Sequence, residues 1–288
     1  MSAQVEKKYL PFDPNPKEPD FPPPTGACDT QIHVSGVGYK KREGATYESV
    51  GATPAAGRRM HQKLGLERGV IVQSSVYGTD NTILLDSLQE LGSNYRGVAL
   101  IDDNTTDAEM GKLHDAGVRG IRFHFAKKIN MAPDPKLLLR SAARAKEMGW
   151  VVKFGPPDEG MAPLMPFVEK LKGQPVIIDH MAKVRDADAP DCKVVCDLLR
   201  AGNLHIMMSN GLLFNNGPNS AGTIAAGRKF VEANVDNLIW GSDWPHPFRE
   251  DYMPNDGDAL NLVYRYADND MGVIKNILVD NPARLFDY

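Results

Sequence analysis

Two histidines and one aspartate, far apart in the chain, each end a short apolar run. His33 ends A-C-D-T-Q-I-H, His180 ends P-V-I-I-D-H, and Asp243 ends N-L-I-W-G-S-D. Short runs of this kind are typical of buried strands, and in a closed parallel barrel the strand ends meet at one mouth. We therefore expect the three side chains to share one pocket. There Asp243 would take a proton from water or from an acidic carbon, with both imidazoles beside it.

A lone histidine of this kind is more often a hydrogen-bonded core residue, and Asp243 could be a buried ion-pair anchor or a helix cap. Three polar residues at three strand ends favour a functional site, because burying charge is costly without a partner or a task. Gln31 lies two residues before His33 and faces the same side of the strand. A histidine at that position would complete a metal-binding His-x-His pair, whereas an amide leaves the ligand set incomplete.

This reasoning predicts an enzyme with the skeleton of a metal site but an incomplete set of ligands, and no other cofactor is expected. A second possibility stays open, namely one divalent metal such as zinc. Its ligands would be His33, His180 and Asp243, because three protein ligands and a water suffice for zinc. A third possibility is a barrel that binds a ligand without catalysis.

A second group of polar residues follows the run R-G-I-R-F-H-F-A-K-K. Arg122 and His124 have the same parity on the expected strand, so both can face the barrel interior. Lys128 lies in the loop that follows, where it is placed to bind a carboxylate or to stabilise an oxyanion. We expect all three to bind substrate.

Three further residues are candidates for substrate binding. Lys153 is a charge within the buried run V-V-K-F, and an inward-facing lysine needs an anionic partner or a substrate. Ser75 and Tyr77, in Q-S-S-V-Y-G-T-D-N, are neutral hydrogen-bonding groups, although such segments often supply turn residues instead.

Strand-like and helix-like patterns alternate from residue 27 to the end of the chain. Thr or Asn before several helical runs and Gly after them match helix-capping preferences. The pattern predicts an α/β fold, a single (β/α)8 TIM barrel over residues 27–288, preceded by an extended proline-rich arm over residues 1–26. An open doubly wound sheet is the alternative, but no G-x-G-x-x-G follows a strand. The expected strands are 27–33, 69–74, 96–101, 119–125, 151–154, 175–180, 204–209 and 237–243.

The composition is that of an ordinary globular chain. It has 288 residues, 42% of them hydrophobic, and a net charge of -4, which argues against a nucleic-acid or membrane-surface partner. There is no apolar run of the ~20 residues that a membrane span needs. The N-terminus lacks a signal-peptide pattern, so a cytoplasmic enzyme is expected. The proline-rich arm leaves a homo-oligomer possible.

Four motifs, D-T-Q-I-H, R-G-I-R-F-H-F, I-I-D-H and G-S-D-W-P-H-P, resemble the amidohydrolase superfamily. Within it they are similar to the group of 2-pyrone-4,6-dicarboxylate lactonases and galactarolactone isomerases. The resemblance runs from Gly26 to the closing N-P-A-R-L-F at 281–286. It implies a (β/α)8 barrel, no metal, and an aspartate on the last strand acting in acid/base catalysis on a lactone.

The same resemblance implies that arginines on and beyond the fourth strand grip the substrate carboxylates. Arg122 matches the first of these, and Lys128 stands in place of the second. A further arginine expected after the seventh strand is missing from S-N-G-L-L-F-N-N, which favours a carboxylated or sugar-acid lactone other than the pyrone dicarboxylate. The expected activity is metal-independent hydrolysis of a small anionic lactone with Asp243 as general base. Lactone isomerisation is the nearest alternative.

Overall fold

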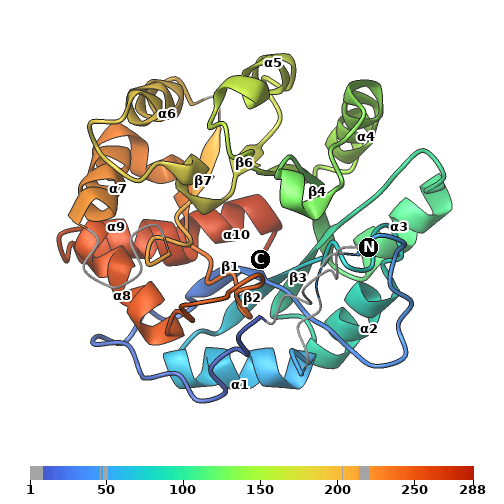
Figure 1. The fold of residues 1–288 in the computed structure, drawn as a ribbon, viewed down its shortest axis with the longest axis horizontal. Helices are drawn as coiled ribbons and strands as arrows, with labels where there is room; N and C mark the ends of the chain where they lie inside the picture. Colours follow the sequence, from blue (N-terminus) through green and yellow to red (C-terminus); the bar gives the residue numbers. More distant parts are fainter. Residues whose placement is uncertain (1–8, 46, 48–50, 203, 214–220) are drawn as a thin grey trace, which may run out of the picture.

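Eight parallel strands form one sheet in which every strand pairs with its neighbours in chain order, and Figure 1 shows strands in the middle of the molecule with helices around them. The computed structural model describes residues 9–45, 47, 51–202, 204–213 and 221–288. The strands are β1 Cys28–Ile32, β2 Arg68–Val72, β3 Tyr95–Ala99, β4 Val118–His124, β5 Val151–Gly155, β6 Val176–Ile178, β7 His205–Met207 and β8 Leu238–Ile239.

Backbone hydrogen bonds bring the end of the sheet back to its beginning. The Thr30 amide donates to the Trp240 carbonyl at 3.0 Å, and the His33 amide donates to the Trp244 carbonyl at 2.8 Å. These bonds join β1 to the segment that follows β8. The predicted (β/α)8 barrel is confirmed.

All of the predicted strands except 151–154 end one to four residues earlier than expected, and for β6 and β8 this displaces a candidate site residue from the strand into a loop. Strand β6 stops at Ile178 and β8 at Ile239, so His180 and Asp243 lie in the segments just beyond. Both have left-handed backbone conformations, with φ of 55° and 65°, which a β-ladder cannot continue. The residues still reach the mouth, but from loops.

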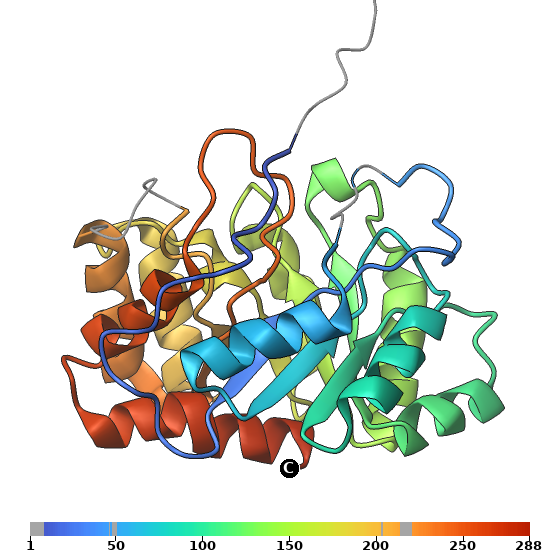
Figure 2. The ribbon, with the colours of Figure 1, turned by 90° about the horizontal axis from the view of Figure 1, so that it is seen from below.

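Helices cover the outside of the barrel, as Figures 1 and 2 show. Several begin at the predicted caps: Thr53 accepts a hydrogen bond from the Ala56 amide, and Thr106 and Glu109 form a capping box. A π-helical turn, Asn276–Asp280, precedes the last helix. The helices are α1 Pro54–Leu64, α2 Thr82–Leu91, α3 Asp107–Asp115, α4 Pro135–Glu147, α5 Met165–Lys170, α6 Pro190–Arg200, α7 Ala221–Asn234, α8 Asp256–Tyr266, α9 Met271–Lys275 and α10 Asn281–Phe286.

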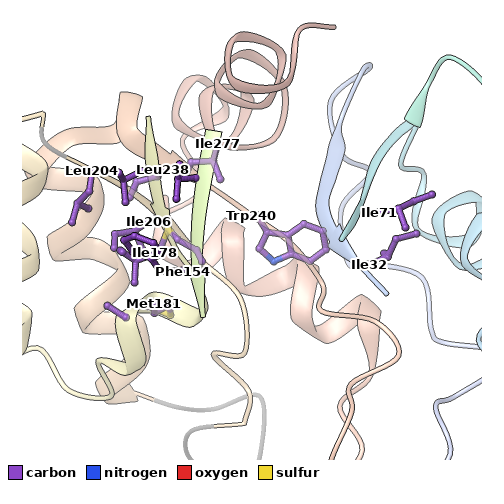
Figure 3. Close-up of a cluster of buried hydrophobic side chains, with 14 of the residues drawn as sticks. Ile32, Ile71, Phe154, Ile178, Met181, Leu204, Ile206, Leu238, Trp240 and Ile277 are labelled. Atoms are coloured by element: carbon purple, nitrogen blue, oxygen red, sulfur yellow. The ribbon is translucent and has the colours of Figure 1, made fainter. Parts of the chain in front are cut away.

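The apolar side chains form two layers, one inside the barrel and one between strands and helices. The inner cluster includes Val70, Val72 and Val151, whereas Ile71, with the opposite parity, belongs to the outer cluster. Figure 3 shows part of the outer cluster, in which Ile178, Ile206 and Leu238 lie close together. Lys153 shares the inward parity of Val151, so its charge lies inside the barrel.

Residues 9–26 contain neither helix nor strand and run along the outside of the barrel, as Figure 2 shows. The Tyr264 hydroxyl donates to the Pro22 carbonyl at 2.9 Å, and the Leu10 amide donates to the Arg249 carbonyl at 2.7 Å. The segment therefore contacts α8 and the loop that follows β8. Residues 1–8 lie outside the described ranges, so the arm over residues 1–26 stays a prediction. None of the helices in the described ranges has both the length and the apolar character that a bilayer crossing needs.

Candidate active site

A cavity of about 240 Å³ opens at the carboxyl ends of the strands. That is the end of a parallel barrel where active sites are found. Seven of the ten predicted site residues line it: His33, Ser75, Arg122, His124, Lys128, His180 and Asp243.

Asp243 is the buried carboxylate at the base of this cavity, and both of its oxygens accept hydrogen bonds. Oδ1 accepts from Gln31 Nε2 at 2.7 Å and lies 3.2 Å from His33 Nε2, and Oδ2 accepts from Asn210 Nδ2 at 3.1 Å. Burial alone would raise the Asp243 pKa. The neighbouring imidazoles of His180 and His33 and the Gln31 amide outweigh it and hold the pKa well below its usual range. The group is therefore ionised at neutral pH.

The two ring nitrogens of His33 face different environments. Its Nδ1 lies 2.8 Å from the Val72 carbonyl oxygen, and because a carbonyl only accepts, Nδ1 carries a hydrogen. Its Nε2 faces Asp243 on one side and Arg122 Nη1, at 3.5 Å, on the other. Nε2 can therefore accept from the guanidinium when the ring is neutral and donate to the carboxylate when it is protonated.

His180 begins a left-handed turn of four residues that ends at Lys183. Its φ values of 55°, 52°, 52° and 59° are unfavourable for L-residues by about 1 kcal/mol or more each. The turn places both His180 and Lys183 at the cavity wall. His180 Nδ1 lies 2.8 Å from Ser209 Oγ, and burial lowers the His180 pKa to about 4 despite the nearby Asp243. The ring is therefore neutral at neutral pH.

Lys153 does not line the cavity, although we expected it to bind substrate. It is completely buried beneath the cavity, and its Nζ lies 3.3 Å from Asp179 Oδ1. The other Asp179 oxygen pairs with Arg122 Nη2 at 2.8 Å. The anionic partner that an inward-facing lysine requires is thus Asp179, and Asp179 also holds the Arg122 guanidinium in place.

Gln31 and Tyr77 also lie away from the cavity wall. Gln31 is fully buried and reaches the site only through its bond to Asp243. The Tyr77 hydroxyl accepts from the Gly36 amide at 3.1 Å, beside a separate small hollow. Both were expected to touch substrate, and the structure gives each a protein partner instead.

His124 lies close to the end of β5. A Cβ at Gly155 would stand 3.3 Å from His124 Nδ1 and 3.5 Å from Arg122 Nη2, so the glycine leaves room for both side chains. Burial lowers the His124 pKa well below its usual range. His124 Nε2 has no hydrogen-bond partner among the described residues, and a ligand in the cavity can supply one.

Several residues that line the cavity were missed by the sequence analysis. Asn210 lies three residues after the end of β7, and a polar residue just beyond a strand end is a signal that could have identified it. The others come from loops or irregular turns without periodicity. They include Tyr47, Lys183, Arg185, Phe248 and Arg249.

The residues around Asp243 are poorly suited to a divalent cation. Its Oδ1 already faces the Gln31 amide nitrogen, and the Arg122 guanidinium lies 3.5 Å from His33 Nε2. A metal ion would need lone pairs around it. The surroundings of Asp243 instead hold N–H hydrogens and a fixed positive charge. Within the described ranges, no three His, Cys, Asp or Glu side chains are grouped as metal ligands.

Comparison with known proteins gives a consistent match over nearly the whole chain. The family model described as Amidohydrolase matches residues 28–288. A 2-pyrone-4,6-dicarboxylate hydrolase from Comamonas testosteroni is 32% identical over 303 aligned positions, which cover 99% of this chain and 98% of the relative. A 4-sulfomuconolactone hydrolase from Rhizobium radiobacter is 33% identical and covers 92% of this chain and 91% of the relative.

A solved structure shows the same architecture. It is the crystal structure, with citric acid bound, of a probable 2-pyrone-4,6-dicarboxylic acid hydrolase from Acinetobacter baumannii. It superposes with a TM-score of 0.79 at 25% identity, over 92% of this chain and 100% of that chain.

Proposed function

Because the chain belongs to the amidohydrolase family, we propose that it hydrolyses a carboxylated lactone without a metal and that Asp243 is the general base. One observation carries this proposal. A buried carboxylate, whose pKa its neighbours hold well below the usual range, stands at the base of the cavity and is anchored through both oxygens by the Gln31 and Asn210 amides. Each carboxylate oxygen can accept more than one hydrogen bond, so Oδ2 keeps an acceptor position for a water molecule.

In the first step the Asp243 carboxylate takes a proton from water as the water oxygen bonds to the lactone carbonyl carbon. The carbonyl oxygen becomes an oxyanion. In the second step the ring C–O bond breaks, and the protonated Asp243 returns its proton to the leaving oxygen. A carboxylate with a depressed pKa is a weak base but, once protonated, a strong acid, which suits the second step.

The developing negative charge needs donors that are in place beforehand. Arg122, held by Asp179, and the two imidazoles of His33 and His180 stand around Asp243. A positioned donor of this kind can contribute ~3 kcal/mol to the transition state in a site that excludes water. In our proposal Arg122 and His180 donate to the carbonyl oxygen, His33 does so through Nε2 when its ring is protonated, and Lys128 binds the acid group of the substrate.

The charge of the cavity supports an anionic substrate. Five cationic side chains and two carboxylates are among the described residues that line it. His124 and His180 add no charge at neutral pH because burial lowers the pKa of each. Relatives of this chain are named for hydrolysis of pyrone-dicarboxylate and sulfomuconolactone rings. The substrate class we propose is a lactone that carries acid groups, from aromatic degradation or sugar-acid breakdown.

The test is a screen of purified protein against such lactones, read by proton release. We expect turnover of at least one, and Asp243→Asn should reduce kcat at least ~100-fold if Asp243 is the base. Full activity in that variant would refute the role. Product identification by NMR separates hydrolysis, which gives an open-chain acid, from isomerisation, which gives a second lactone.

The metal alternative is tested on the same preparation. Elemental analysis and assays after chelation are expected to show activity without stoichiometric metal. Bound zinc whose removal abolishes turnover, with recovery on adding it back, would establish the mononuclear reading in which His33, His180 and Asp243 are ligands.

A further inference from the structure

One buried carboxylate beside the segment of Asp243 has no part in the proposed reaction. Asp29, the first residue of D-T-Q-I-H, lies on β1 and is completely buried. It is not among the residues that line the cavity, so it cannot contact a substrate there. Burying a carboxylate is unfavourable unless its oxygens have partners, and the partners of Asp29 identify the part of the site that it holds.

One oxygen of Asp29 accepts hydrogen bonds from two backbone amides. Oδ1 lies 3.0 Å from the Gln31 nitrogen, two residues further along β1, and 2.9 Å from the Ser242 nitrogen, beyond the end of β8. The pairing of β1 with β2 is irregular between Asp29 and Ile32, and there Asp29 gives the Gln31 amide a partner. A single oxygen thus joins the two segments that close the barrel next to Asp243.

Both amides belong to residues that determine where the Asp243 carboxylate lies. Gln31 donates to that carboxylate through its side chain, and Ser242 precedes Asp243 in the chain. The Asp243 amide in turn donates to the Gln31 carbonyl at 3.0 Å. Asp243 has a left-handed backbone conformation, with φ of 65°, which a residue other than glycine keeps only where the surrounding structure fixes it. The bonds to Asp29 are part of that surrounding structure.

The other oxygen of Asp29 is held from the outer layer of the barrel. Oδ2 lies 3.3 Å from Nε2 of His61, on α1, and Nδ1 of His61 lies 2.9 Å from the hydroxyl of Tyr95, on β3. Both of these aromatic side chains are buried. The carboxylate therefore cannot turn away from the two amides without breaking a bond in a region of low dielectric.

We propose that Asp29 is a positioning residue for Asp243. Its Oδ1 holds the Gln31 and Ser242 amides, and through them it sets the distance between the Asp243 carboxylate and the Gln31 side chain. This inference rests on the proposed function, because it takes Asp243 as the base. The substrate-binding candidates Arg122 and Lys128 come from β4 and the turn after it, and β4 does not pair with β1. Loss of Asp29 should therefore lower kcat and leave KM nearly unchanged.

The experiment compares Asp29→Ala with Asp29→Asn in the whole protein, on the lactone found in the screen. Alanine removes the acceptor. Asparagine keeps one oxygen for the two amides, and its nitrogen can donate to His61, which has an acceptor nitrogen in either neutral tautomer. We expect kcat of Asp29→Ala to fall at least ~10-fold with KM within ~2-fold of the original value. In Asp29→Asn, kcat should return to within ~3-fold of the original.

If Asp29→Ala does not fold, Asp29→Ser takes its place with the same expected loss. The serine hydroxyl fills part of the space and can accept from the Gln31 amide two residues on. It lies one bond closer to the main chain than the carboxylate oxygens, so it cannot also hold the Ser242 amide.

A second readout needs no turnover. The Gln31 side-chain amide is bonded to a buried carboxylate, so its NMR signal should exchange slowly with solvent. Its absence from the spectrum of Gln31→Glu identifies the signal. We expect slow exchange to persist in Asp29→Asn and to be lost in Asp29→Ala, because only the second variant frees the Gln31 backbone.

Asn281→Ala is the matched control. Asn281 is likewise buried, and its Nδ2 donates to two backbone carbonyls, but these lie at or just before the start of β8, at the opposite end from Asp243. Urea unfolding should show a loss of stability in this variant, as in Asp29→Ala. Its kcat and its Gln31 signal should equal those of the unaltered protein.

An unchanged kcat in Asp29→Ala, a loss that appears in KM instead, or an Asp29→Asn variant as impaired as Asp29→Ala would overturn the inference. So would a Gln31 signal that exchanges equally slowly in both Asp29 variants. The proposed function fails separately if no lactone is hydrolysed, and the Gln31 signal then decides alone whether Asp29 positions the Asp243 carboxylate.

Discussion

The Gln31 amide nitrogen donates to Asp243 Oδ1 at 2.7 Å across 212 positions of sequence. Both residues are almost completely buried, so the bond lies in a region of low dielectric where it is strong. Gln31 thereby acts on the carboxylate proposed to be the base rather than on the substrate.

Gln31→Glu would place a second carboxylate against Asp243. Two neighbouring carboxylates resist being ionised together, so the pKa of the pair should rise and the acidic limb of the kcat/KM profile should move to higher pH. We expect at least ~10-fold loss of kcat/KM at neutral pH, measured across pH 4 to 9. Gln62→Glu, at an exposed position of α1, is the control. An unshifted acidic limb in Gln31→Glu would show that this bond does not tune the base.

His180 should make folding stability depend on pH. Its pKa is lowered to about 4 in the folded protein, against ~6.5 in an unfolded chain. Between these values the unfolded state binds more protons, so stability is full above about pH 6.5 and is lost as pH falls towards 4. The loss from this residue is up to ~3 kcal/mol. Urea unfolding of His180→Gln between pH 4.5 and 7 should show a flatter dependence.

His205 provides the control for that measurement. Burial lowers its pKa to about 4 as well, but it begins β7 at the end of the barrel away from the cavity. His205→Gln should also flatten the stability profile while lactone turnover persists, whereas His180→Gln should lose turnover. If His180→Gln keeps the original slope, the ring is not held neutral by burial.

Lys153→Met should destabilise the protein by about 3 kcal/mol, because removal of one member of a buried ion pair leaves charge uncompensated. Asp179 would then pair with Arg122 alone. We expect the Arg122 guanidinium to shift towards Asp179, and this shift should lower kcat/KM. Chemical denaturation and kinetics measure the two effects. Lys172→Met removes an exposed pair with Glu169 and should cost under ~1 kcal/mol. Equal costs for the two variants would contradict the assignment of Lys153 to the buried pair.

Gly155→Ala tests how closely the cavity wall is packed. The added methyl group would lie 3.3 Å from His124 and 3.5 Å from Arg122, so we expect a modest displacement and a loss of kcat/KM of about 3- to 10-fold with a stability change within ~1 kcal/mol. Gly111→Ala, in α3 with no atom within 4 Å, should stabilise the protein by ~0.5–1 kcal/mol and leave turnover unchanged. Unchanged kinetics in Gly155→Ala would show that His124 and Arg122 accommodate the added methyl group without any effect on turnover.

The sequence by itself determined the barrel and the meeting of His33, His180 and Asp243 at its mouth. Short Val- and Ile-rich runs alternate with capped amphipathic segments, and each signal is local. The ends of parallel strands converge in a barrel whatever the conformation of the loops. Site residues at or just beyond the strand ends could therefore be predicted, even though β6 and β8 stop early.

Only the tertiary structure decided what each side chain touches. Lys153 faces inward as its parity predicts, but its partner Asp179 comes from another strand end. Arg249 reaches the cavity from a loop, and loops carry no periodicity from which direction can be predicted. Contacts between residues far apart in sequence depend on how the whole barrel closes, and no local pattern in the chain encodes them.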